Sequence, residues 1–190
     1  RKLANYKNSG IRPAMALVRK SIFDSIQDLI DDANVLDLCA GSGILGIEAL
    51  SRGARSLTLV DADKLAVGLI RKNLALCNAE GTVIFGRLPG VLKRLDPERE
   101  QFDVIFLDPP YGNASMITDV LQMISNKKLL KNEGLISIEA ESKCDYKVPE
   151  DLFVFREKSY GNTKVTFLRC HSEPHSLRSV QAPATWQSFL

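Results

Sequence analysis

The chain has 190 residues, of which 45% are hydrophobic and 25% charged, and its formal net charge at pH 7 is +2. This length and apolar content predict one globular domain with a sizeable core. No apolar run reaches the roughly 18 residues that cross a bilayer, and no secretory leader pattern opens the sequence, so a cytoplasmic protein without a membrane partner is expected. The four cysteines are widely spaced and include no C-x-x-C pair, which predicts reduced, mostly buried thiols rather than a disulfide framework or a zinc site.

The basic residues are unevenly distributed along the chain. Residues 1–20 hold six of them and no acidic residue, whereas the rest of the chain holds 19 basic and 23 acidic residues. Clustered Lys and Arg on a mildly acidic domain favour docking onto a polyanion, because their binding releases the counterions of phosphate groups. A solvated terminal segment with no partner is the alternative interpretation.

Hydrophobic periodicity predicts a helix early in the chain. From Pro13 to Ile30, apolar residues recur at three- and four-residue steps, as on one face of an amphipathic helix. Residues 1–33 are therefore expected to form a basic arm and this helix. Residues 34–39 have the pattern of a short apolar strand, and the glycine-rich turn and helix that follow end at Gly53.

The order of strand and helix then repeats along the chain. A strand over 56–60 leads into a helix over 63–78, in which four leucines are expected to face the core: Leu65, Leu69, Leu74 and Leu76. The remaining segments of this alternating part are helices over 89–95 and 115–125, and strands over 82–85, 102–107 and 134–139. Continuous apolar strands separated by helices predict a parallel sheet that is covered on both faces.

The end of the domain follows a different pattern. Strands over 152–157 and 164–169 are joined by only six residues, and so short a connection permits only an antiparallel hairpin. The predicted fold is therefore α/β and Rossmann-like, a seven-stranded, mostly parallel sheet with an antiparallel C-terminal hairpin, as in the class I S-adenosylmethionine-dependent methyltransferases. Residues 34–170 would form this domain, and residues 171–190 a loosely held tail.

A glycine-rich turn follows the first strand. Gly41 to Gly46 fit the G-x-G-x-x-G pattern, and Asp61 falls 20 residues after Gly41, so that the dinucleotide fingerprint is formally present. Asp37 argues against NAD, because a carboxylate four residues before the first glycine would repel a pyrophosphate but attract the ammonium and sulfonium of S-adenosylmethionine. The glycines would let the backbone approach that cofactor, and Asp61 would accept hydrogen bonds from its ribose. The predicted cofactor site consists of Asp37, Ala40, Gly41, Ser42, Gly43, Asp61, Ala62 and Leu88.

The sequence Asp108-Pro109-Pro110-Tyr111 follows the fourth strand and predicts the reaction centre. An exocyclic base amine is conjugated with its ring and is a poor nucleophile. If the Asp108 carboxylate and the Pro109 carbonyl accept its hydrogens, its lone pair is directed at the methyl donor, and the prolines keep the turn rigid. Tyr111 would stack on a base that is flipped out or already unpaired. A simple turn at the strand end is the alternative.

Two other chemistries are less consistent with the sequence. Pro174 lies between His171 and His175 and interrupts a helix that would bring both imidazoles to one face, so no metal site is expected. Ser42 has no histidine within reach of a catalytic triad, because His171 and His175 are the only two in the chain.

The sequence resembles the RsmD-type methyltransferases, the bacterial enzymes that methylate guanine N2 in 16S ribosomal RNA. The resemblance spans about residues 1–169. It rests on Arg12-Pro13 and Val18-Arg19, on DLCAGSGILGIEALSRGA at 37–54, on LDPPY at 107–111 and on YGNTKVTFLR at 160–169. The chain departs from the family at Arg87-Leu88, where an acidic residue is common.

The resemblance implies that Asp37, Gly41, Gly43 and Asp61 bind S-adenosylmethionine and that 108–111 positions guanine. It implies RNA contacts in the amino-terminal arm, with Lys7, Arg12, Arg19 and Lys20 as candidates. The expected protein is a monomeric guanine-N2 methyltransferase that acts on 16S ribosomal RNA or on a small-subunit particle. The chemistry of the motif suits adenine N6 equally well, and a non-catalytic RNA assembly factor that binds the cofactor is a further alternative.

Overall fold

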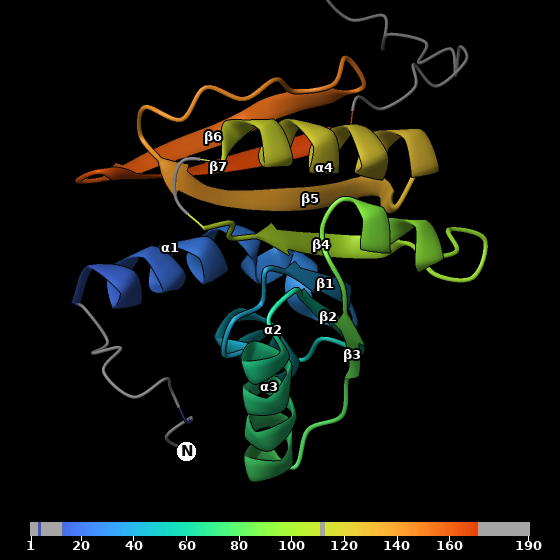
Figure 1. Cartoon of the computed structure of the whole chain (residues 1–190). Coiled ribbons are helices and arrows are strands. Elements are labelled where there is room, and N and C mark those ends of the chain that lie inside the picture. Colours follow the sequence, from blue (N-terminus) through green and yellow to red (C-terminus); the bar gives the residue numbers. More distant parts are fainter. Residues whose placement is uncertain (1–3, 5–12, 111–112, 171–190) are drawn as a thin grey trace, which may run out of the picture.

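The computed structural model describes residue 4, residues 13–110 and residues 113–170, and Figure 1 shows their arrangement. A single sheet runs through the molecule, with helices on both of its faces. The helical elements are α1 (Pro13–Ile30), α2 (Ile44–Ser51), α3 (Lys64–Cys77), the 3₁₀ helix η1 (Gly90–Arg94) and α4 (Ala114–Lys127). The strands are β1 (Asn34–Leu38), β2 (Ser56–Asp61), β3 (Thr82–Phe85), β4 (Phe102–Leu107), β5 (Leu130–Glu141), β6 (Leu152–Tyr160) and β7 (Thr163–Cys170).

The seven strands lie in the order β3-β2-β1-β4-β5-β7-β6. The first five in this order pair in parallel, whereas β7 pairs antiparallel with both β5 and β6. The sequence-based prediction of a mostly parallel sheet closed by an antiparallel hairpin is therefore confirmed. The strand order reverses between β1 and β4, and in open α/β sheets ligands bind beside such a point, at the carboxyl ends of the strands.

Two apolar layers cover the sheet. On one face, α1, α2 and α3 pack on residues such as Val104 and Phe106 of β4, and on the other face η1 and α4 pack on Ile105 and Leu107. The ring of Phe23 in α1 meets that of Phe106 edge-on, with the ring centroids 5.8 Å apart. The helix of the segment 1–33 thus packs into the same core as the sheet.

The structure corrects three expectations about local structure. The strand predicted over 134–139 is part of a longer strand, β5, which begins at Leu130 and pairs with β4 on both sides of a register shift. Leu65 and Leu76 are 74% and 45% exposed, because the buried side of α3 is formed by other positions: Ala66, Val67, Ile70, Asn73 and Leu74. The four cysteines are free thiols, but all are partly exposed rather than buried.

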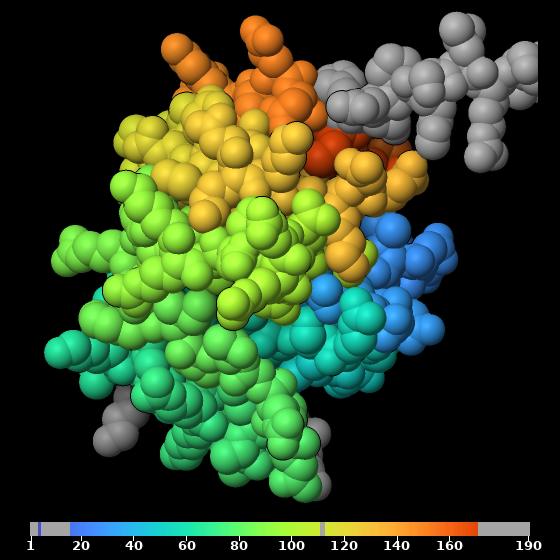
Figure 2. All heavy atoms as spheres, turned by 90° about the vertical axis from the view of Figure 1, so that its right-hand side faces the viewer, coloured from blue at the N-terminus to red at the C-terminus, as the bar shows by residue number. Residues whose placement is uncertain are grey.

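The edge of the sheet at which β4 and β5 begin is opposite the carboxyl ends. Figure 2 shows this face, with the chain around residue 100 near its middle. In the part of the chain that the structure describes, no helix combines the length and the apolar composition needed to cross a membrane. The residues predicted to form a tail, 171–190, lie outside that part.

Candidate active site

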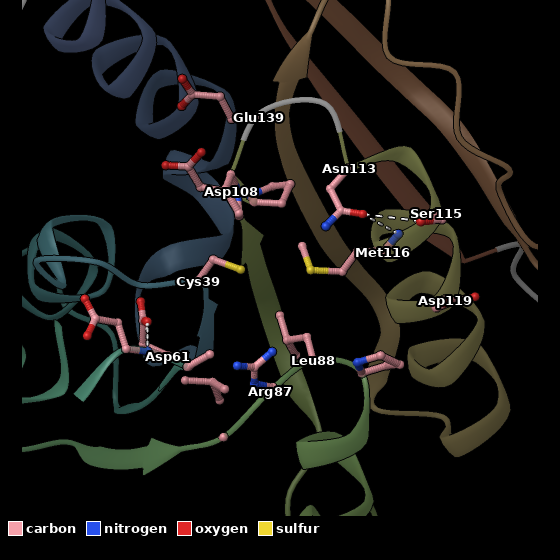
Figure 3. Close-up of a pocket in the computed structure, with 17 residues that line it drawn as sticks. Cys39, Asp61, Arg87, Leu88, Asp108, Asn113, Ser115, Met116, Asp119 and Glu139 are labelled. Carbon is pink, nitrogen blue, oxygen red and sulfur yellow. Dashed lines mark hydrogen bonds between the residues drawn. The ribbon is translucent and has the colours of Figure 1, made fainter. Parts of the chain in front are cut away.

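A cavity of about 840 Å³ lies at the carboxyl ends of the parallel strands (Figure 3). Its walls come from the ends of β1, β2, β4 and β5, from the turn after β3 and from the start of α4. Five of its described lining residues are acidic and one, Arg87, is basic. The lining consists of Cys39, Val60, Asp61, Ala62, Asp63, Gly86, Arg87, Leu88, Pro89, Asp108, Pro109, Pro110, Asn113, Ser115, Met116, Asp119 and Glu139.

The glycine-rich turn after β1 lies beside this cavity. Gly41 and Gly43 have φ angles of +57° and +75°, in the left-handed region that side chains rarely adopt, so glycine is needed for the backbone path itself. Gly43 also precedes the first turn of α2, where the Ile47 N–H donates to its carbonyl at 2.9 Å. Ala40, Gly41, Ser42 and Gly43 form this turn but do not belong to the cavity lining.

Asp37 lies beneath the turn rather than on the cavity wall. Its side chain is buried, and its carboxylate accepts a hydrogen bond from the Gly46 N–H at 2.9 Å. A Cβ atom at position 46 would come within 2.6 Å of Leu57 and 3.1 Å of Asp37 Oδ2, so only glycine permits this close packing. Burial raises the pKa of Asp37 to about 7, although the hydrogen bond from Gly46 acts to lower this pKa. The structure therefore gives Asp37 a role in holding the start of α2, and its contact with the cofactor stays a prediction.

Asp61, Ala62 and Leu88 of the predicted cofactor residues line the cavity. The two oxygens of Asp61 accept backbone hydrogen bonds at 2.8 Å each, Oδ2 from Gly41 and Oδ1 from Asp63. Each oxygen keeps a second lone pair that a ligand hydroxyl can use. Leu88 is half-buried beside Arg87 and offers an apolar surface on which a flat ring can pack.

Asp108, Pro109 and Pro110 line the cavity from the end of β4, and Tyr111 lies outside the described residues. The Asp108 N–H donates to the Leu38 carbonyl at 3.3 Å, which continues the pairing of β4 with β1. Although Asp108 has surface open to the cavity, protein surrounds its carboxyl group on most other sides. This loss of solvation, together with the Glu139 and Asp37 carboxylates, raises the pKa of Asp108 to about 8.

Sequence reasoning missed several residues of the cavity. Glu139 lies near the end of an apolar strand, as Asp108 does, so its position in β5 is a signal that could have found it. Cys39 lines the wall from the turn after β1, and its thiol pKa is raised to about 12 by burial and by nearby carboxylates. Asn113 caps α4, because its Oδ1 accepts from the Met116 N–H at 3.2 Å, and the helix start that it fixes forms the opposite wall (Figure 3).

The predicted RNA-binding residues have different environments. Arg19 is paired with Glu48 of α2 at 2.8 Å, and Arg52 donates to the same carboxylate at 2.7 Å, so two guanidinium groups share one negative charge. Lys20 is largely exposed but pairs with Asp24 one turn later at 2.7 Å. Lys7 and Arg12 lie outside the described residues.

Asn73 of α3 connects two distant parts of the backbone. Its amide group is buried, accepts from the Ala4 N–H at 2.8 Å and donates to the Ala4 carbonyl at 2.9 Å. The same Nδ2 atom donates to the Ser42 carbonyl at 2.9 Å. One side chain thus holds the glycine-rich turn and the backbone of residue 4.

Comparison with known proteins identifies the family. The family described as Conserved hypothetical protein 95 matches residues 1–169. Ribosomal RNA small subunit methyltransferase D of Haemophilus influenzae is 31% identical over 163 residues, which cover 85% of this chain and 84% of that protein. The chain belongs to the RsmD-type methyltransferase family. The RsmD-type protein of the same name from Escherichia coli K12 is 32% identical over 162 residues, which cover 85% of this chain and 80% of that protein.

Solved structures agree with this RsmD-type fold. The Escherichia coli protein yhhF has a TM-score of 0.79 at 30% identity, and the match covers 91% of this chain and 93% of that one. The ribosomal protein L11 methylase of Lactobacillus delbrueckii has a TM-score of 0.67 at 18% identity, with 83% and 80% of the two chains covered. The similarity to the L11 methylase concerns the fold alone. It shows that the same fold also occurs outside the RsmD-type proteins.

Proposed function

We propose that this chain uses S-adenosylmethionine to methylate the exocyclic N2 amine of a guanine in small-subunit ribosomal RNA. The observation that carries the proposal is an acidic cavity at the carboxyl ends of the strands, with Asp108-Pro109-Pro110 in its wall. The names of the Haemophilus influenzae and Escherichia coli relatives support small-subunit ribosomal RNA as the substrate. Such a substrate implies a cytoplasmic protein that binds RNA or a small-subunit particle, and we propose that it acts as a monomer.

The charge of the cavity fits S-adenosylmethionine better than a dinucleotide. Five carboxyl groups and one guanidinium line it among the described residues, a balance that attracts the ammonium and sulfonium groups and repels a pyrophosphate. Its volume of about 840 Å³ lies within the range of ligand sites, roughly 300–1,000 Å³. Asp61 would accept the ribose hydroxyls, and Leu88 would pack on the adenine. When bound, the cofactor supplies an electrophilic methyl group.

The protein's own residues position and activate the amine. The Asp108 carboxylate and the Pro109 carbonyl accept the two amine hydrogens, which directs the nitrogen lone pair at the methyl donor. Pro110 follows in the cavity wall, and the two prolines restrict the backbone, so the acceptors are held in place before the base enters. Asp108 then accepts the proton that the methylated nitrogen releases. A pKa of about 8 is well placed for this proton transfer near neutral pH.

Methyl transfer to unmodified small-subunit RNA tests the proposal. The products are digested to nucleosides, and the methylated base is identified by mass spectrometry. N2-methylguanosine is expected from the wild type, and the Asp108→Ala variant should lose at least about 99% of the rate, as expected when an essential hydrogen-bond acceptor is removed. Asp145→Ala, at an exposed position away from the cavity, is the matched control and should keep full activity.

The outcomes separate the alternative functions. If the product is N6-methyladenosine, the target base is adenine instead of guanine, because the same two acceptors suit the adenine amine. Cofactor binding without turnover on free RNA or on small-subunit particles would favour a non-catalytic assembly factor. Full activity of Asp108→Ala would contradict the mechanism whatever the base.

A further inference from the structure

Glu139 and Asp108 occupy neighbouring positions on two adjacent strands. The parallel register of β4 and β5 pairs Leu107 with Ile138, so the next residues along the two strands are Asp108 and Glu139. Both line the cavity, and Figure 3 shows their carboxyl groups on the same side of it. A carboxyl group from the end of β4 and one from β5 therefore lie on the same side of the cavity.

Within the described residues, neither carboxyl group receives a hydrogen bond from the protein. Among the described residues, no side chain or backbone amide forms a hydrogen bond or ion pair with Glu139, and loss of solvation alone raises its pKa. Asp108 likewise has no hydrogen-bond donor for its side chain in the described part of the chain. Both carboxyl groups are poorly solvated and lack a donor from the described residues, so they are costly to ionise. A ligand that brings two donors relieves this cost.

The bases that carry an exocyclic amine differ in the neighbouring ring nitrogen. In guanine the amine is next to N1–H, which is a donor. In adenine it is next to N1, and in cytosine next to N3, and both of these are acceptors. A carboxylate can only accept hydrogen bonds, so a second carboxylate beside the amine site attracts the guanine edge and repels the other two.

We propose that Glu139 is a specificity-determining residue, which accepts the N1–H of the target guanine while Asp108 accepts a hydrogen of its amine. The inference rests on the proposed function, because it assigns the base choice of the same site. It explains how a motif that suits any exocyclic amine is restricted to one base. Charge-assisted hydrogen bonds of this kind are strong, and a site built around one rejects analogues that lack the donor.

Replacement of the target guanine by a base analogue, 2-aminopurine, tests this assignment. In 2-aminopurine the amine is retained, but N1 is an acceptor instead of a donor. Rates are measured on two RNA fragments that carry guanine or 2-aminopurine at the methylated position, each with wild type and Glu139→Gln. The wild type should prefer guanine by about tenfold or more, the discrimination that one charged hydrogen bond provides. In Glu139→Gln this preference should shrink by about tenfold, because an amide can face either a donor or an acceptor.

Two controls make the comparison specific to position 139. Glu141→Gln carries the same substitution two residues further along β5, at an exposed position outside the cavity, and should keep the wild-type preference. The loss of guanine O6 in 2-aminopurine affects all variants alike, so the ratio between variants reports the contact with N1. S-adenosylmethionine binding by each variant confirms that its fold is intact.

The inference and the proposed function fail in different ways. If the wild type produces N2-methylguanosine but Glu139→Gln keeps the full preference for guanine, the role of Glu139 is wrong and the proposed function stands. If Glu139→Gln does not fold, the test is the comparison of wild-type rates on the two RNAs. Equal wild-type rates on guanine and 2-aminopurine overturn the inference. A product methylated on adenine overturns both.

Discussion

The Asp61 carboxylate and the Gly41 backbone N–H are joined by a hydrogen bond of 2.8 Å, which ties the end of β2 to the turn after β1. The other oxygen of Asp61 accepts from the Asp63 N–H, also at 2.8 Å. Asp61 therefore fixes the backbone of the turn and of residue 63, and it also lines the cavity. The hydrogen bond thus connects the glycine-rich turn to the Asp61 carboxylate, although 20 residues separate Gly41 from Asp61 in the sequence.

Replacement of Asp61 should weaken cofactor binding. In Asp61→Asn the amide nitrogen, itself a donor, faces one of the two backbone N–H groups. The oxygen that would accept from a ribose hydroxyl at that position is also lost. Affinity for S-adenosylmethionine should therefore fall by about tenfold or more. Titration calorimetry with S-adenosylmethionine measures the change. Asp145→Asn, at an exposed position outside the cavity lining, is the control and should bind as well as the wild type. Equal affinities of wild type and Asp61→Asn would contradict the assignment of the ribose contact.

Methyl transfer should become faster as the pH rises toward about 8. The pKa of Asp108 is raised from 3.8 to about 8, so below that pH the carboxyl group is mostly protonated and cannot take up the amine proton. The value of kcat/KM should increase by up to about tenfold per pH unit on the acidic side and then level off. Glu139→Gln removes a neighbouring negative charge and should move this midpoint to lower pH. A flat profile between about pH 6 and 8 would show that Asp108 is already ionised.

Stability should depend on pH through Asp37. Its pKa is about 7 in the folded protein against 3.8 for a free side chain, so between these values the folded state holds a proton that the unfolded state has lost. The contribution of Asp37 to the free energy of unfolding should therefore decrease as pH rises from about 4 to 7, by at most about 1.4 kcal/mol per pH unit. Asp108, with a pKa of about 8, should extend the decrease in the same direction to about pH 8. Urea denaturation at about pH 5 and 8 should show a smaller difference for Asp37→Asn. A wild-type protein that gains stability over this range would refute the argument.

Two glycine-to-alanine substitutions should have opposite effects on stability. At Gly46 an added Cβ would lie 2.6 Å from Leu57 Cδ1, so Gly46→Ala should destabilise the protein by about 1–3 kcal/mol, as overpacking does. At Gly68, inside α3, nothing lies within 4 Å of an added Cβ. Gly68→Ala should raise stability by about 0.5–1 kcal/mol, since alanine loses less backbone entropy in a helix. Thermal unfolding of the two variants provides the comparison, and a loss at position 68 equal to that at 46 would contradict the packing argument.

The fold was predictable because each of its signals is local. Apolar strands, glycine turns and the six-residue connection of the last hairpin each lie within a short stretch of sequence. The position of Glu139 near the end of an apolar strand is a local signal, but no local signal tells which strand is the neighbour of β4, and only that pairing brings Glu139 beside Asp108. The RNA contact of Arg19 stays a prediction, and its ion pair with Glu48, set by the packing of α1 on α2, was not predictable from the sequence.

The same limit applies to the orientation of α3. Its leucines indicate a helix, yet the side that faces the core is decided by contacts with β2 and β3, which leave Leu65 and Leu76 exposed. Likewise, Asp37 was predicted to contact the cofactor, whereas its burial under Gly46 follows from the close packing of α2 on the sheet and has no local signal. Residue type indicated which strand ends lie at the cavity, and tertiary packing decided which atoms face it.

The buried amide of Asn73 has a thermodynamic consequence for the whole site. Its Nδ2 atom donates to the carbonyls of both Ala4 and Ser42. The position of Ala4 and the conformation of the turn at Ser42 are therefore energetically coupled. A ligand that fixes the glycine-rich turn also favours the docked position of Ala4, and by reciprocity the docking of Ala4 favours that ligand to the same extent. The conformation of the glycine-rich turn and the position of Ala4 are thus parts of one linked equilibrium.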